Sequence, residues 1–203
     1  MRDCFKQSIV ESMTYKYSLP ILAFVLLAAC DQAAPPAPDL ATEAQRIANE
    51  SIIVDTHIDV PYRLSEAAAD VSQATDGGDF DYPRARAGGL DAAFMSIYTP
   101  AGLEAEGRSR EEADQLIDLV VDIALASDGK FAIATSPGEV RENFEKGVMS
   151  LPLGMENGSP LDGDLANLRH FHERGIRYIT LAHSQSNHLS DSSYDENRQW
   201  NGL

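Results

Sequence analysis

The chain has 203 residues, 32 of them acidic and 16 basic, and its formal net charge of −16 disfavours nucleic acid as a partner, because phosphate binding needs a surplus of lysine and arginine. The length and a hydrophobic share of 43% suffice for one globular domain. Both cysteines, Cys4 and Cys30, lie within the first 30 residues, so the remainder has neither a disulfide nor a thiol nucleophile.

The chain begins with a pattern typical of a secretion signal. Lys16 precedes the apolar run 19–29, which ends in small residues before Cys30. The tetrapeptide LAAC at this point resembles the bacterial lipobox, so we expect residues 1–30 to be a lipoprotein signal peptide, with Cys30 carrying the lipid. A signal for simple secretion is the alternative. Translation from Met13 would give a more compact leader.

A linker follows this leader. Residues 31–44 are rich in proline and alanine and can bury little surface, which predicts a tether rather than part of a core. We therefore expect the domain, residues 45–203, to be anchored in the bacterial cell envelope, on the periplasmic or other extracytoplasmic face of a membrane.

Helical and strand-like segments alternate beyond the tether, which indicates α/β architecture. The helix over 109–130 is expected to start at an N-cap, Ser109, and the helix over 136–147 at Ser136. The stretch 68–89 is expected to be loop. The complete set of expected helices is 41–51, 109–130, 136–147 and 164–175, and the expected strands are 52–58, 90–99, 148–157 and 176–184.

Alternating strands and helices fit either a doubly wound sheet or a closed barrel, and periodicity alone does not separate the two. Polar residues follow the apolar runs, where barrel enzymes gather their catalytic groups. Neither GxGxxG nor GxxxxGK[ST] occurs, which disfavours nucleotide binding. A complete (β/α)8 TIM barrel needs about 250 residues. Residues 41–203 are fewer than this, so we expect only about the first half of a barrel.

His57 and Asp59 stand two positions apart at the end of the first expected strand. In a regular strand such residues point to the same face, so an imidazole and a carboxylate could converge on one divalent metal ion. The simpler interpretation is a hydrogen-bonded pair at a strand end. Placement directly after a buried run makes the two interpretations about equally attractive.

Glu156 and His183 follow the third and fourth expected strands. A carboxylate after so apolar a run is costly unless it is compensated, and a metal ion would compensate it, although a surface glutamate is the simpler interpretation. For His183 a ligand or substrate contact competes with an ordinary loop histidine. His188 lies in a polar stretch and could also contact substrate. His170 and His172 face apart on a helix and are not expected to act together.

Four segments, taken together and in order, resemble the membrane dipeptidase family (renal dipeptidase-like, peptidase family M19). The segments are IVDTHIDVP, DYPRARAGGLDAAFMSIYTP, LPLGMENGSPL and GIRYITLAHSQSNHLSDSS. The match begins near residue 45 and runs to the C-terminus. The resemblance implies a (β/α)8 barrel of the metal-dependent, amidohydrolase-like hydrolase type that holds two zinc ions (Zn2+) and cleaves dipeptides.

Carried over position by position, the resemblance implies that His57 and Asp59 bind one zinc ion and that Glu156 bridges both. His183 would help to bind the dipeptide substrate and polarise its scissile carbonyl, which makes Glu156 and His183 the catalytic pair. A metal-bridged hydroxide would be the nucleophile, so neither a serine nor a cysteine is needed. A homodimer is one assembly that the resemblance leaves open.

The resemblance is incomplete, because the family also uses two histidines and an aspartate on later strands. We therefore expect the chain to be an N-terminal fragment of a zinc dipeptidase that is poorly folded and inactive by itself, since an unfinished parallel sheet leaves an open edge. Two alternatives are a non-catalytic, lipid-anchored binding protein and an amidohydrolase that acts on a lactone or a non-peptide amide.

Overall fold

The structure is a computed structural model that describes residues 39–196. In this part of the chain, six parallel strands form one sheet. All but the first two of these residues belong to one unit, Ala41–Leu203. This confirms the predicted α/β class. The strands are β1 (Ile53–Ile58), β2 (Leu90–Tyr98), β3 (Phe131–Ile133), β4 (Met149–Leu151), β5 (Leu153–Glu156) and β6 (Ile176–Ile179).

β1 forms one edge of the sheet among the described strands. β1 pairs with β2, β2 pairs with both β4 and β5, and these pair on their other side with β3 and β6 respectively. β4 and β5 follow each other along the same side of β2 and are separated only by Pro152, which has no N–H to donate. The carbonyl of Pro152 still accepts a hydrogen bond from the N–H of Met95 at 2.8 Å. The strand order departs from the chain order at one place, because β4 rather than β3 pairs with β2.

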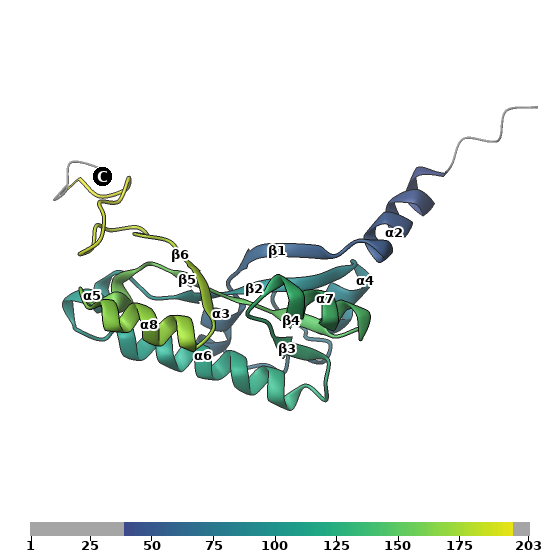
Figure 1. Cartoon of the computed structure of the whole chain (residues 1–203), viewed down its shortest axis with the longest axis horizontal. Coiled ribbons are helices and arrows are strands. Elements are labelled where there is room, and N and C mark those ends of the chain that lie inside the picture. Colours follow the sequence, from purple (N-terminus) through teal and green to yellow (C-terminus); the bar gives the residue numbers. More distant parts are fainter. Residues whose placement is uncertain (1–38, 197–203) are drawn as a thin grey trace, which may run out of the picture. The chain divides into compact units, whose positions relative to one another are not determined.

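One face of the sheet is covered by helices and forms the core (Figure 1). On β2, Ala93, Met95 and Ile97 are buried and point toward this helical layer. The residues between them on β2 face the opposite side, where the polar groups lie. The described helices are α2 (Leu40–Glu50), α3 (Val60–Glu66), α4 (Tyr82–Ala87), α5 (Gly102–Ala105), α6 (Ser109–Ala126), α7 (Pro137–Glu145), α8 (Leu165–Glu173) and the 3-10 turn Ser159–Leu161.

The helix predictions were largely confirmed, with corrections at the ends. α7 has Ser136 as its N-cap, whose side chain accepts from the N–H of Glu139 as its position before Pro137 predicted. In α6 the N-cap position is Arg108, whose side chain makes no capping bond, and the predicted cap Ser109 is already helical. No helix within residues 39–196 has the length and apolar character that a membrane crossing requires.

Five short elements were missed: α3, α4, α5, the 3-10 turn Ser159–Leu161 and β3. The stretch predicted to be loop contains α4, which starts where the buried Asp81 accepts the N–H of Arg84. This capping bond, with Pro83 in the first turn, outweighs the glycines around it. β3 was also missed, because a three-residue strand carries too little periodicity to recognise. The last expected strand stops at Ile179, so His183 lies in the following loop.

Candidate functional site

The structure brings together all four residues that the sequence singled out for the site. His57 lies near the end of β1, Asp59 precedes α3, Glu156 is the last residue of β5 and His183 follows β6. Because the strands are parallel and adjacent, their carboxyl ends meet at one edge of the sheet. Convergence of these side chains therefore follows from the topology.

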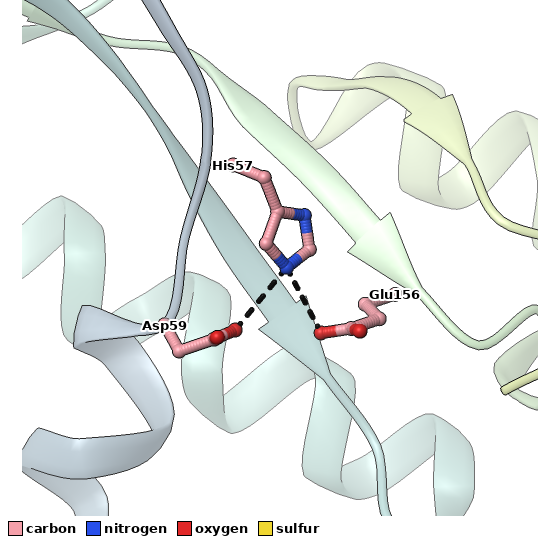
Figure 2. Close-up of side chains that lie close together, drawn as sticks. All are labelled: His57, Asp59 and Glu156. Atoms are coloured by element: carbon pink, nitrogen blue, oxygen red, sulfur yellow. Dashed lines mark hydrogen bonds and ion pairs between the residues drawn. The ribbon is translucent and has the colours of Figure 1, made fainter. Parts of the chain in front are cut away.

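The imidazole of His57 is at the centre of the cluster (Figure 2). Its Nε2 lies 3.3 Å from Oδ1 of Asp59 and 3.2 Å from Oε2 of Glu156. One ligand atom from each of these three residues lies within 4.8 Å of the others. On its other side, Nδ1 of His57 lies 2.8 Å from the hydroxyl of Tyr178.

His57 and Asp59 converge through an irregular strand end rather than through the regular pleat that was predicted. The pairing of β1 with β2 shifts by one residue between Asp55 and Ile58, so His57 lies in a bulge rather than in a regular pleat. The carboxylate of Asp55 accepts the backbone N–H of His57 at 3.0 Å and holds this irregular turn. Asp59 occupies the N-cap position of α3 without a capping bond from its side chain, which leaves the carboxylate facing His57.

Glu156 is not the surface residue of the simpler interpretation, since its side chain is only 16% exposed. Its Oε2 accepts the hydroxyl of Ser96 at 2.9 Å and faces His57, whereas its Oε1 lies 3.2 Å from Nε2 of His183. One carboxylate thus presents its two oxygens to two different imidazoles. Burial beside these partners holds it in one orientation.

His183 is partly exposed and can contact another molecule on one side. Its side chain is 39% exposed, and its ring packs edge-on against Tyr98 with 5.0 Å between centroids. Its Nδ1 is buried and makes no hydrogen bond within residues 39–196. A loop histidine that contacts Glu156 and stays accessible has the placement expected of a substrate contact.

Two tyrosines beside Glu156 keep their protons over a wide pH range. Burial raises the pKa of Tyr98, and the negative charge of Glu156 raises it further. The pKa of Tyr178 is raised by the same two causes in the same order. Both hydroxyls therefore remain neutral hydrogen-bonding groups at neutral pH.

A buried pair of asparagines fixes the strand ends around the cluster. Asn157 donates through Nδ2 to the carbonyl of Thr99 at 2.9 Å, and its Oδ1 accepts from Nδ2 of Asn187 at 2.9 Å. Asn187 also donates to the carbonyl of Leu181 at 2.7 Å. The pair thus connects the ends of β2 and β5 to the loop that carries His183.

Two further histidines are engaged elsewhere. His188 places Nδ1 2.7 Å from Oε1 of Glu104, which ties the loop after β6 to α5. His170 faces Asp114 of α6 at 2.8 Å and is not part of the cluster, as predicted. Cys30, the predicted lipid attachment site, lies outside the described residues.

Sequence reasoning missed Ser96, Tyr178 and the asparagine pair. Ser96 carried a signal, because it is a polar residue inside an apolar strand, two positions before Tyr98. For Tyr178 the signal was indirect: Gly154 in a buried strand indicates that another group approaches closely.

The donor set fits a divalent metal ion. His57, Asp59 and Glu156 offer one neutral nitrogen and two anionic oxygens, a combination suited to zinc and similar ions. When Nε2 is the ligand atom, the ring proton resides on Nδ1, where the Tyr178 hydroxyl can accept it. A cation would also relieve the repulsion between two carboxylates that converge on one point.

Comparison with known proteins gives a consistent result. A family model described as membrane dipeptidase (peptidase family M19) matches residues 41–203. Dipeptidase aclJ of Aspergillus oryzae is 32% identical over 133 residues, which cover 62% of this chain and 32% of that protein. The uncharacterized dipeptidase C3A11.10c of Schizosaccharomyces pombe is 27% identical over 166 residues, covering 74% of this chain and 41% of that protein.

The fold comparison agrees. The crystal structure of the dipeptidase AC, a metallopeptidase of family M19, matches with a TM-score of 0.60 at 25% identity, over 66% of this chain and 43% of that one. The chain therefore spans between about a third and less than half of the length of the relatives that it matches.

Proposed function

Because the chain belongs to the membrane dipeptidase family, peptidase family M19, we propose that it forms part of a zinc-dependent enzyme that hydrolyses dipeptides. The observation that carries the proposal is the convergence of one imidazole nitrogen and two carboxylate oxygens within 4.8 Å of one another. This cluster lies at the carboxyl edge of a parallel sheet, where barrel enzymes hold their catalytic groups.

His57, Asp59 and Glu156 would hold the metal in this proposal. A bound divalent metal lowers the pKa of water toward neutrality and polarises a carbonyl oxygen, which is the chemistry that hydrolysis of an amide requires. We propose two zinc ions with Glu156 as the ligand common to both, because both of its carboxylate oxygens lie at the cluster. Ser96 supports this role by donating to Oε2, which fixes the plane of the carboxylate.

His183 would act on the substrate. Its Nε2 lies beside Glu156 and its ring is partly exposed, so a dipeptide at the cluster could accept a hydrogen bond from it. A donor placed at the scissile carbonyl stabilises the negative charge that develops on the oxygen during hydrolysis. The edge contact with the Tyr98 ring would keep the imidazole in place while substrate enters.

The test uses the product of the complete reading frame that contains this sequence. Metal-free protein is titrated with Zn2+ and then assayed for amino acid release from a panel of dipeptides, including some with a D-residue second. We expect about two equivalents of zinc and metal-dependent hydrolysis. Glu156→Gln should abolish both, whereas Glu142→Gln, at an exposed position on α7, should change neither.

Two outcomes would contradict the proposal in different ways. If the protein binds zinc but hydrolyses no dipeptide, its reaction is on another amide or a lactone. If it binds no divalent metal at all, it is a non-catalytic binding protein. In the first case, comparing zinc binding by Glu156→Gln and Glu142→Gln shows whether the cluster holds the metal.

We also propose that the protein is lipid-anchored through Cys30 at an extracytoplasmic membrane face. The supporting observation is the LAAC tetrapeptide at the end of a short apolar run. Cys30→Ser should move the protein from the membrane fraction to the soluble fraction and prevent incorporation of labelled fatty acid. Equal fractionation of the two proteins would refute the anchor.

A further inference from the structure

Tyr178 connects β6 to the far strand β1 across the site. Its hydroxyl lies 2.8 Å from Nδ1 of His57 and 3.2 Å from the backbone carbonyl of Thr56. We propose that Tyr178 is a positioning residue for His57: it holds the imidazole so that Nε2 faces the two carboxylates. This inference rests on the proposed function, because it gives His57 the role of a metal ligand.

The hydrogen-bond directions are consistent along the whole chain of contacts. A metal-binding Nε2 must carry a lone pair, which leaves the ring proton of His57 on Nδ1. Nδ1–H then donates to the Tyr178 oxygen, and the Tyr178 O–H donates to the Thr56 carbonyl. Each group has one partner of the right kind. Removing the hydroxyl would leave Nδ1–H without this acceptor and free the ring to rotate.

Residues on the neighbouring strands fix the position of the Tyr178 ring. Gly154 lies beside Tyr178 on the neighbouring strand β5, and a Cβ at that position would overlap the tyrosine ring. The ring of Phe94 also packs against Tyr178, with 5.4 Å between centroids. The glycine makes room and the phenylalanine limits sideways motion, so the hydroxyl reaches β1 in one position.

A direct role for Tyr178 in the reaction is less consistent with its contacts. Both hydrogen-bonding directions of its hydroxyl are already used, by His57 and by Thr56. A role in packing alone would need the ring but not the oxygen. The oxygen is therefore the atom to test.

The experiment removes the oxygen and, separately, displaces the ring. Tyr178→Phe keeps the ring and loses the hydroxyl, whereas Gly154→Ala keeps the hydroxyl and pushes the ring away from its place. Tyr82→Phe is the control, because the Tyr82 ring is also packed against an aromatic neighbour, Phe131, at 5.4 Å. All are made in the product of the complete reading frame, and zinc affinity is measured by competition with a chelator.

We expect Tyr178→Phe to weaken zinc binding by about 10- to 100-fold, the usual effect of removing the partner that orients a metal-binding histidine. Gly154→Ala should act in the same direction and Tyr82→Phe should leave the affinity unchanged. In histidine-labelled protein loaded with zinc, Tyr178→Phe should also shift the Nδ1 resonance of His57 and speed exchange of its proton with water. These readouts do not depend on catalytic activity.

The failure of this inference is distinguishable from the failure of the proposed function. If the unaltered protein binds zinc and Tyr178→Phe binds it equally well, with an unchanged His57 resonance, Tyr178 does not position His57 and the inference is wrong. If the unaltered protein binds no zinc, the proposed function fails, and this role of Tyr178 fails with it. Misfolding of Gly154→Ala would still leave Tyr178→Phe as the test.

Discussion

Asn157 allows a quantitative test of how the site is held together. Its side chain is buried and makes three hydrogen bonds: to the Thr99 carbonyl, from the Ser159 N–H and from Asn187. Its backbone has a φ of 74°, in the left-handed region that asparagine tolerates better than most residues. Substitution by alanine removes the three bonds and places a less tolerant residue at this φ.

The two effects can be estimated separately. Each buried hydrogen bond contributes about 0.5–1.5 kcal/mol net, so three give roughly 1.5–4.5 kcal/mol. The left-handed backbone adds about 1 kcal/mol for alanine. We therefore expect Asn157→Ala to lower the free energy of unfolding by about 2.5–5.5 kcal/mol. Asn157→Gly loses the same bonds without the backbone strain, so it should be less destabilising by about 1 kcal/mol or somewhat less.

Urea unfolding followed by circular dichroism measures these differences. Asp128→Ala provides the matched control, because Asp128 is exposed and has a φ of 53°. That variant reports the backbone cost alone and should lose only about 1 kcal/mol. If Asn157→Ala costs no more than Asp128→Ala, the buried hydrogen bonds contribute nothing and our account of the strand ends is wrong.

Three further predictions concern substrate contact, acid stability and the sheet edge. His183→Gln should lower kcat by about 100-fold while leaving zinc affinity within a few-fold, which steady-state kinetics and zinc titration measure; an equal loss of affinity would make His183 a metal ligand instead. The backbone N–H groups of Arg84 and Thr75 lower the pKa of Asp81 from 3.8 to about 2, so the stability that its charge provides is complete above about pH 4 and is lost as the pH falls through 2. Urea midpoints of metal-free protein should fall over that interval, and less steeply in Asp81→Asn; parallel curves would contradict this. β1 has one neighbour among the described strands, and its Val54 is 44% exposed, so the 203-residue chain alone should self-associate in light scattering and hydrolyse no dipeptide; a soluble, active monomer would refute this.

The sequence predicted where the site lies because one rule of topology is enough. Polar residues after apolar runs meet when the strands are parallel and adjacent, whatever the order of the strands in the sheet. His57 and Glu156 are 99 positions apart, yet their side-chain atoms are 3.2 Å apart for this reason. The expected strands indicated which residues follow a strand, and the family resemblance grouped these residues into one site.

The details of the site were less predictable because they depend on pairing between distant strands. A regular pleat was expected to align His57 with Asp59, but the shift in pairing with β2 puts His57 in a bulge. That shift cannot be read from the local pattern of β1. The role of Tyr178 is equally hidden, since it depends on the absence of a side chain at Gly154 on another strand.

The ends of β2, β5 and β6 each contribute a residue near the cluster and a residue that holds the strand end in place. Glu156 is followed directly by Asn157, and Tyr98 by Thr99, whose carbonyl accepts from Asn157. The Asn157 N–H in turn donates to the hydroxyl of Thr180, two residues after Tyr178. Asn157 thus joins the residues that follow β2, β5 and β6, directly beyond the side chains that face the cluster. The positions of the site residues therefore depend on three adjacent strand ends together. A hydrogen bond at one strand end can fix the position of a site residue on another strand without contacting that residue.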